Sequence, residues 1–243
     1  LMFAINRDAV YPCPQDKAER IIALGEELLQ KSTDTRQREN AVQCLCYTYD
    51  NIDKEKALYY ADRSGSFNIT REGLRSTILD GEEGVKACQS YIMSLIHTAA
   101  MTASNMTSKI QFSHKETIEA YRFAIDILKR LYSDGNIGFY AFDVSYYYNN
   151  IALKYAEIND TENTLKALEE GCKYAIIEAN LKDMDYTAPM VNRMKHKKSN
   201  VSKNYKGNAC NLRLKTLEDK RFDFVRNEEV FKKIVTDLEK YAG

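Results

Sequence analysis

The amino-acid sequence predicts an all-α fold in which antiparallel helix pairs stack on one another. Apolar residues recur at the three- and four-residue spacing of helices along most of the 243 residues. Only 10 glycines and 3 prolines interrupt this pattern, too few for the turns of an all-β chain. No segment alternates apolar and polar residues clearly enough to predict a strand.

Residues 1–15 are expected to be irregular because prolines flank Cys13 and disfavour helix. Helical spacing begins at Asp16 and continues to Lys31, where residues 32–35 supply a break and capping side chains. Two further helices are expected around residues 41–49 and 57–64. The turn between them is expected at residues 51–53.

The central part of the chain predicts longer helices separated by short turns. A short helix is expected over 70–79, and Asp80-Gly81 ends it. Apolar stripes then predict helices over residues 83–106, 114–132, 138–158 and 161–180.

The last part of the chain begins with a change in composition. Residues 186–205 are rich in Lys and poor in apolar residues, so a basic loop is expected. Two C-terminal helices are expected over roughly 206–219 and 227–241. Together these elements predict one helical repeat domain over residues 16–243.

Composition disfavours several classes of function. Lys and Arg total 35, as do Asp and Glu, whereas a dedicated nucleic-acid-binding module normally carries a basic excess. No apolar run approaches the ~18–20 residues of a membrane span, and the first residues do not resemble a signal peptide. We therefore expect a cytoplasmic protein that does not contact a membrane.

The chemistry-bearing residue types do not form a catalytic or metal-binding pattern. The 6 cysteines include no C-x-x-C pair, and only 3 histidines accompany them. Glycine-rich phosphate loops and hydrolase or metalloprotease motifs are also missing from the sequence. We expect reduced cysteines, no cofactor, no metal and no enzymatic activity.

Residues 148–171 resemble a tetratricopeptide repeat, in which small residues let two helices approach and large residues fill the space between them. The residues that carry the resemblance are Tyr148, Ile151, Ala152, Tyr155, Thr164, Leu168 and Gly171. A second copy over residues 41–64 lies about three periods of ~34 residues earlier. This resemblance implies a right-handed superhelical solenoid with two C-terminal capping helices. The alternative is an irregular helical bundle.

The C-terminal region is similar to that of bacterial helix-turn-helix transcriptional regulators of the Cro/repressor type. The resemblance is carried by residues 203–208 and 221–231. Phe224 and Val230 depart from the family's pattern, whereas Phe222 and Phe231 keep its apolar anchors. The resemblance implies that this chain is the ligand- or protein-binding sensor or oligomerisation domain of such a regulator. The DNA-binding part of the regulator is not in this chain. The alternative is a tetratricopeptide scaffold with no role in transcription. Dimerisation stays open.

The resemblance implies that a concave groove binds a peptide or protein. The candidate groove residues lie on the first helix of each expected helix pair, which lines the concave face. They are Tyr146, Asn149, Leu153, Gln89, His97, Gln43 and Tyr49. Met93 and Ser94 are further candidates on the helix of His97. The alternative is that these positions are solvated or belong to the core. We expect the tyrosines at 140 and 146–148 to pack internally for the most part.

A stretch without acidic residues follows Asp185 and ends before Glu218. Its basic residues could contact phosphates or an acidic partner. The candidate patch comprises Arg193, Lys195, Lys197, Lys198 and Lys203. The alternative is an ordinary solvated loop.

Overall fold

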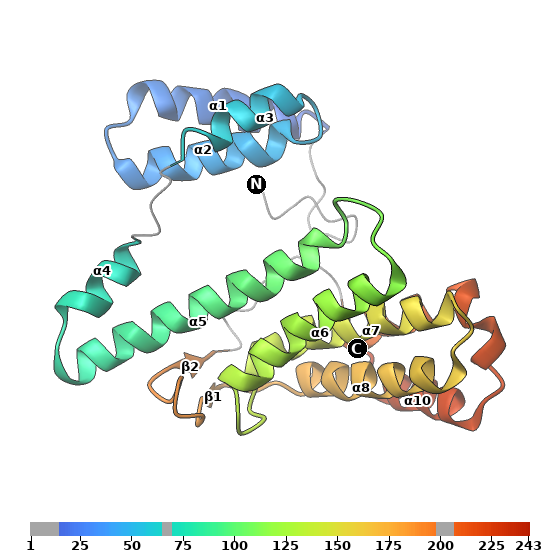
Figure 1. The fold of residues 1–243 in the computed structure, drawn as a ribbon. Coiled ribbons are helices and arrows are strands. Elements are labelled where there is room, and N and C mark those ends of the chain that lie inside the picture. Colours follow the sequence, from blue (N-terminus) through green and yellow to red (C-terminus); the bar gives the residue numbers. More distant parts are fainter. Residues whose placement is uncertain (1–14, 65–69, 198–206) are drawn as a thin grey trace. The chain divides into compact units, whose positions relative to one another are not determined.

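Figure 1 shows the fold in a computed structural model, which describes residues 15–64, 70–197 and 207–243. These ranges are predominantly helical and contain almost no strand, so the predicted all-α class is confirmed. The chain divides into two compact units, with the boundary between Thr70 and Arg71. Residues 207–243 belong to the second unit. One helical domain is expected from the sequence over residues 16–243, without any sign of this division. No helix in the described ranges has the length and apolar character required to cross a bilayer.

The first unit contains the helices α1 (Lys17–Lys31), α2 (Thr35–Tyr49) and α3 (Lys54–Ala61). Asp34 caps the N-terminus of α2, and Asp53 caps that of α3. Each side chain accepts a hydrogen bond from a backbone N–H of the first turn. α1 lies close to α2 at Gly25. A Cβ atom at Gly25 would lie 2.8 Å from Cγ of the fully buried Leu45.

The second unit begins with α4 (Arg71–Ile78), α5 (Gly81–Met106) and α6 (His114–Leu131). α5 contacts both α4 and α6 and is the longest of the described helices. A capping box starts α6: Ser113 Oγ accepts from the backbone N–H of Glu116, and the Glu116 carboxylate accepts from the backbone N–H of Ser113.

The helix expected over 138–158 opens with one tighter turn, and the unit continues through η2 (Gly138–Tyr140), α7 (Ala141–Ala156) and α8 (Thr161–Ala179). α7 and α8 pack closely where the repeat pattern places small residues. Ser145 Oγ donates a 2.8 Å hydrogen bond to the Gly171 carbonyl. Ala152 and Leu168, both part of the sequence pattern, are buried in the core of the unit.

A short hairpin interrupts the stretch that the sequence analysis assigned to loop. β1 (Met184–Asp185) pairs antiparallel with β2 (Lys195–His196). The expectation of no strand is wrong here, because two-residue strands leave no readable alternation in the sequence. Tyr186 anchors this hairpin against Gly138, where a Cβ would lie 2.6 Å from the tyrosine hydroxyl.

The unit ends with α9 (Ala209–Leu217), η4 (Lys220–Val225) and α10 (Glu229–Tyr241). α8 contacts both α9 and α10. Phe222 and Phe231 are buried, and their ring centroids lie 6.5 Å apart. Phe222 and Phe231, two of the residues that carry the C-terminal sequence resemblance, therefore help to hold this end of the unit together, whereas residues 203–206 lie outside the described residues.

Candidate functional site

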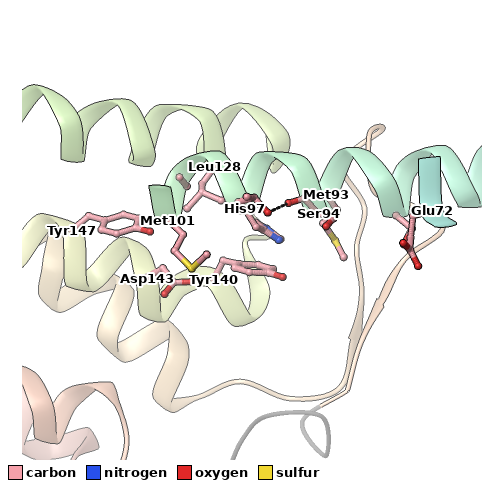
Figure 2. A pocket seen from close by; sticks show the side chains of 12 residues that line it. Glu72, Met93, Ser94, His97, Met101, Leu128, Tyr140, Asp143 and Tyr147 are labelled. Carbon is pink, nitrogen blue, oxygen red and sulfur yellow. Dashed lines mark hydrogen bonds between the residues drawn. The ribbon is translucent and has the colours of Figure 1, made fainter. Parts of the chain in front are cut away.

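A pocket of about 540 Å³ lies in the second unit, with α5 along one side and η2 and α7 along the other. α5 contributes side chains three and four residues apart, which places them on one face of the helix. Figure 2 shows this arrangement. The lining residues are Glu72, Ser90, Met93, Ser94, His97, Thr98, Ala100, Met101, Leu128, Tyr140, Asp143 and Tyr147.

His97 projects from α5 and is fixed by two tyrosines. Its Nε2 lies 3.0 Å from the Tyr132 hydroxyl oxygen, and its ring stacks on Tyr140 with centroids 3.3 Å apart. Burial lowers the pKa of His97 to about 3. His97 is therefore neutral near pH 7 and brings no positive charge to the pocket.

Asp143 stands in the first turn of α7, between Tyr140 and Tyr147. These positions differ by three and four residues, so all three side chains share one face. Burial alone raises the pKa of Asp143 to about 6. Burial is also the main cause of the raised pKa values of both tyrosines, and the charge of Asp143 adds to it.

The pocket is acidic and has the chemistry of a binding site. Its lining includes the carboxylates of Asp143 and Glu72 and no Lys or Arg. Hydroxyl groups on α5 offer hydrogen bonds, and the tyrosines and methionines offer apolar and aromatic surface. Across the described parts of the chain, no group of three or more His, Cys, Asp or Glu residues could hold a metal ion.

The predicted residues on α5 fall into two different environments. His97, Met93 and Ser94 do line the pocket. Gln89 does not, because its side chain is buried with 5% exposure. Its amide donates to the Pro189 carbonyl at 2.9 Å and accepts from the Arg193 backbone N–H at 2.8 Å. Gln89 thus holds the hairpin against α5 and is unavailable to a ligand.

The predicted groove residues on α7 also fall into different environments. Asn149 has 4% exposure and lies where α7 meets α8, so its prediction as a ligand contact is wrong. Leu153 is partly buried and packs against the core. Tyr146 is 41% exposed, but it contacts Tyr121 and lies outside the pocket lining.

The C-terminal elements explain why α7 has less free surface than expected. The guanidinium carbon of Arg213, on α9, lies 5.8 Å from the Tyr146 ring centroid. Arg221, on η4, forms a 2.6 Å ion pair with Glu157 just after α7. α9 and η4 lie far from α7 in the sequence. The spacing of residues within α7 therefore could not predict that these segments cover part of its surface.

The two candidates in the first unit differ from each other. Gln43 is exposed, and its role in binding stays a prediction. Tyr49 is 5% exposed and stacks on Tyr60 with ring centroids 5.7 Å apart. Its hydroxyl donates to Glu26 Oε1 at 3.3 Å. Tyr49 therefore belongs to the core of the first unit, and its prediction as a groove residue is wrong.

The predicted basic patch is largely neutralised where the structure describes it. Arg193 Nε lies 3.1 Å from a Glu82 carboxylate oxygen, and Lys195 Nζ lies 3.2 Å from one of Asp185. Lys197 is exposed. The remaining predicted members, Lys198 and Lys203, lie outside the described residues. The described part of the patch is thus a weak candidate for phosphate binding.

Sequence reasoning missed Asp143 and gave Tyr140 and Tyr147 no role at a site. A usable signal exists, because Asp143 is the only charged residue between Ile137 and Leu153. A single acid in an otherwise uncharged, aromatic-rich helix is unusual, since a buried charge needs compensation. The pocket itself depends on how α5 approaches α7, which no local pattern encodes.

The chain was compared with protein-family models, with curated proteins and with solved structures, and no significant match was found. The fold class therefore comes from the structure itself. Arguments about function rest on the pocket and on the sequence pattern.

Proposed function

We propose that this chain is the ligand-sensing part of a bacterial transcriptional regulator and that its ligand is a peptide or a segment of a protein. In this proposal the helix pairs α5–α6 and α7–α8 act as tetratricopeptide-like repeats of a right-handed solenoid that α9 and α10 cap. The pair α2–α3 is a further such repeat in the first unit. The helix-turn-helix that reads DNA lies outside this chain. Support comes from the C-terminal sequence resemblance and from the pocket between α5 and α7.

The observation that carries the proposal is the length of the hollow surface along α5. A second hollow of about 400 Å³ is lined by α4, by the beginning of α5 and by Met194. It shares Glu72 and Ser90 with the first pocket. The combined groove follows α5 from Glu83 to Met101, which corresponds to roughly 27 Å at the helical rise per residue.

The dimensions of this groove suit an extended chain. A peptide in extended conformation advances ~3.3 Å per residue, so roughly eight residues span this length. Ser94 and Thr98 are exposed on the groove side of α5 and can bond to a peptide backbone. Met93 and Met101 adapt their shape to different apolar side chains.

The test is to recover the natural ligand. The protein that carries this chain is produced in its native host and purified, and bound molecules are released and analysed by mass spectrometry. A Ser94→Trp variant places a large side chain in the groove at an exposed position. Ser133→Trp makes the same change on an exposed turn outside the groove and is the matched control.

We expect a short peptide from the wild-type protein and the Ser133→Trp control, and a loss of at least tenfold with Ser94→Trp. Adding the recovered peptide should change the affinity of the complete protein for its operator DNA. Equal recovery of the same peptide from both variants would refute the groove as its site. Recovery of an intact folded protein, with no effect on DNA binding, would favour the scaffold alternative.

A further inference from the structure

The Asp143 carboxylate is a partly buried negative charge with no positive partner among the described residues. Burial is the only cause of its raised pKa, so no described cation lies close enough to lower it. No ion pair joins Asp143 to a Lys, Arg or His within the described ranges. Charged groups that are shielded from water are normally paired, because their desolvation is otherwise unfavourable. Among the described residues, the pocket therefore lacks a positive charge to pair with the Asp143 carboxylate.

The surroundings of Asp143 indicate what would complete it. Figure 2 shows the carboxylate between Tyr147 and Tyr140, with Met101 of α5 facing it across the pocket. Aromatic faces attract organic cations through their π electrons, and a carboxylate adds a charged hydrogen bond. A metal ion fits less well, because the described residues offer no group of three or more His, Cys, Asp or Glu ligands.

We propose that the pocket between α5 and α7 is a subsite for an organic ammonium group, which binds to Asp143 among Tyr140, Tyr147 and Met101. This inference rests on the proposed ligand-sensing function and specifies the chemistry of the ligand. The ammonium group belongs either to a peptide, as its amino terminus or a lysine side chain, or to a small free amine. The absence of Lys and Arg from the pocket lining leaves this charge to the ligand.

A pair of isosteric probes tests the role of the charge. Tryptamine carries an ammonium group, and tryptophol has a neutral hydroxyl in its place. The chain has no Trp, so indole fluorescence reports on the probe alone. Both are titrated into the wild-type protein, into Asp143→Asn and into Asp126→Asn. Asp126 is an exposed acid on α6 outside the pocket and controls for overall charge.

We expect the wild-type protein and Asp126→Asn to bind tryptamine at least tenfold more tightly than tryptophol, as a charged hydrogen bond predicts. In Asp143→Asn this preference should disappear. Equal affinity for the two probes in the wild-type protein, or failure of tryptamine to bind, overturns the proposal. A native peptide that still binds equally to wild type and Asp143→Asn leaves the proposed function intact and refutes only the ammonium subsite.

The pH dependence supplies a second readout. Asp143 gains a proton as the pH falls through about 6, so tryptamine should bind more weakly at pH 5 than at pH 7. His97, Tyr140 and Tyr147, which face Asp143 from α5, η2 and α7, keep their neutral forms in this range. Glu72 also lines the pocket, from α4, and the control Asp126→Asn, which lies outside the pocket, should leave the pH profile unchanged. If tryptamine binding to Asp143→Asn depends on pH as it does in the wild-type protein, the assignment of this dependence to Asp143 is wrong.

Three tryptophan-containing peptides separate the sources of the ammonium group. The tripeptide amide Trp-Ala-Ala is compared with its N-acetylated form and with N-acetyl-Trp-Ala-Lys amide. Binding of the first alone identifies an amino terminus, and binding of the third identifies a lysine side chain. Binding of tryptamine but of neither charged peptide identifies a free amine. Binding of the acetylated Trp-Ala-Ala as tight as that of the others overturns the requirement for charge.

Discussion

Replacing Asp143 by asparagine should stabilise the folded protein at neutral pH. The pKa of Asp143 is about 6, compared with an ordinary value of 3.8. A factor of ten in proton affinity corresponds to about 1.4 kcal/mol, so the ionised carboxylate destabilises the folded state by on the order of 3 kcal/mol at pH 7. Asparagine has a similar shape but also loses hydration, so we expect a net gain of roughly 1–2 kcal/mol.

The gain should depend on pH in a defined direction. The pKa of Asp143 is higher in the folded than in the unfolded protein. Its favourable contribution is therefore complete below about pH 3.8 and is lost as the pH rises through about 6. The advantage of Asp143→Asn should be largest at pH 7–8 and should shrink toward pH 4. His97 has the opposite dependence, because burial lowers its pKa to about 3, but it is common to both proteins.

Thermal unfolding followed by circular dichroism at several pH values measures this difference. A gain of roughly 1–2 kcal/mol corresponds to an increase of about 2–8 °C in Tm for a unit of this size. Asp126→Asn serves as the control and should leave Tm nearly unchanged at every pH. A lower Tm for Asp143→Asn at pH 7, or a difference independent of pH, would refute the account of Asp143 as an unpaired buried charge.

Three further substitutions test the packing and capping of helices in the two units. Gln89→Ala removes the hydrogen bonds between α5 and the hairpin, and it should lower the unfolding free energy by roughly 2–4 kcal/mol. Faster hydrogen exchange at the Tyr186 amide would show the hairpin loosening, and unchanged exchange would contradict it. Gly25→Ala should destabilise the first unit by roughly 1–3 kcal/mol in urea unfolding, because its Cβ would collide with Leu45. Ser113→Ala should lower stability by about 1 kcal/mol through loss of the α6 cap, and no change would mean that solvent replaces the cap.

Most helices could be predicted from the sequence because their signals are local. The apolar stripe of α6 lies between the capping residue Ser113 and a turn at Gly135, and the structure places the helix between them. The small residues Ala152 and Gly171 likewise lie where two helices approach closely. The hairpin at 184–196 escaped prediction because its strands are two residues long.

The candidate site was predicted less well because burial depends on distant segments. Gln89 and Asn149 occupy plausible surface positions on their helices, but the hairpin covers one and α8 covers the other. Periodicity shows which face of a helix is polar. It does not show whether another segment meets that face with matching hydrogen bonds. His97 does line the pocket, whereas no sequence pattern pointed to Asp143, because the residues around it lie on both α5 and α7.

The most direct test of the central claim is to locate a bound ammonium probe on the molecule. Methionine methyl groups labelled with ¹³C report on the pocket through Met93 and Met101, and on surfaces outside it through Met106 and Met190. On titration with tryptamine, the account predicts shifts of the Met93 and Met101 signals that saturate together, with Met106 and Met190 unmoved. Saturable shifts of Met106 or Met190 without those of Met93 and Met101 would contradict it.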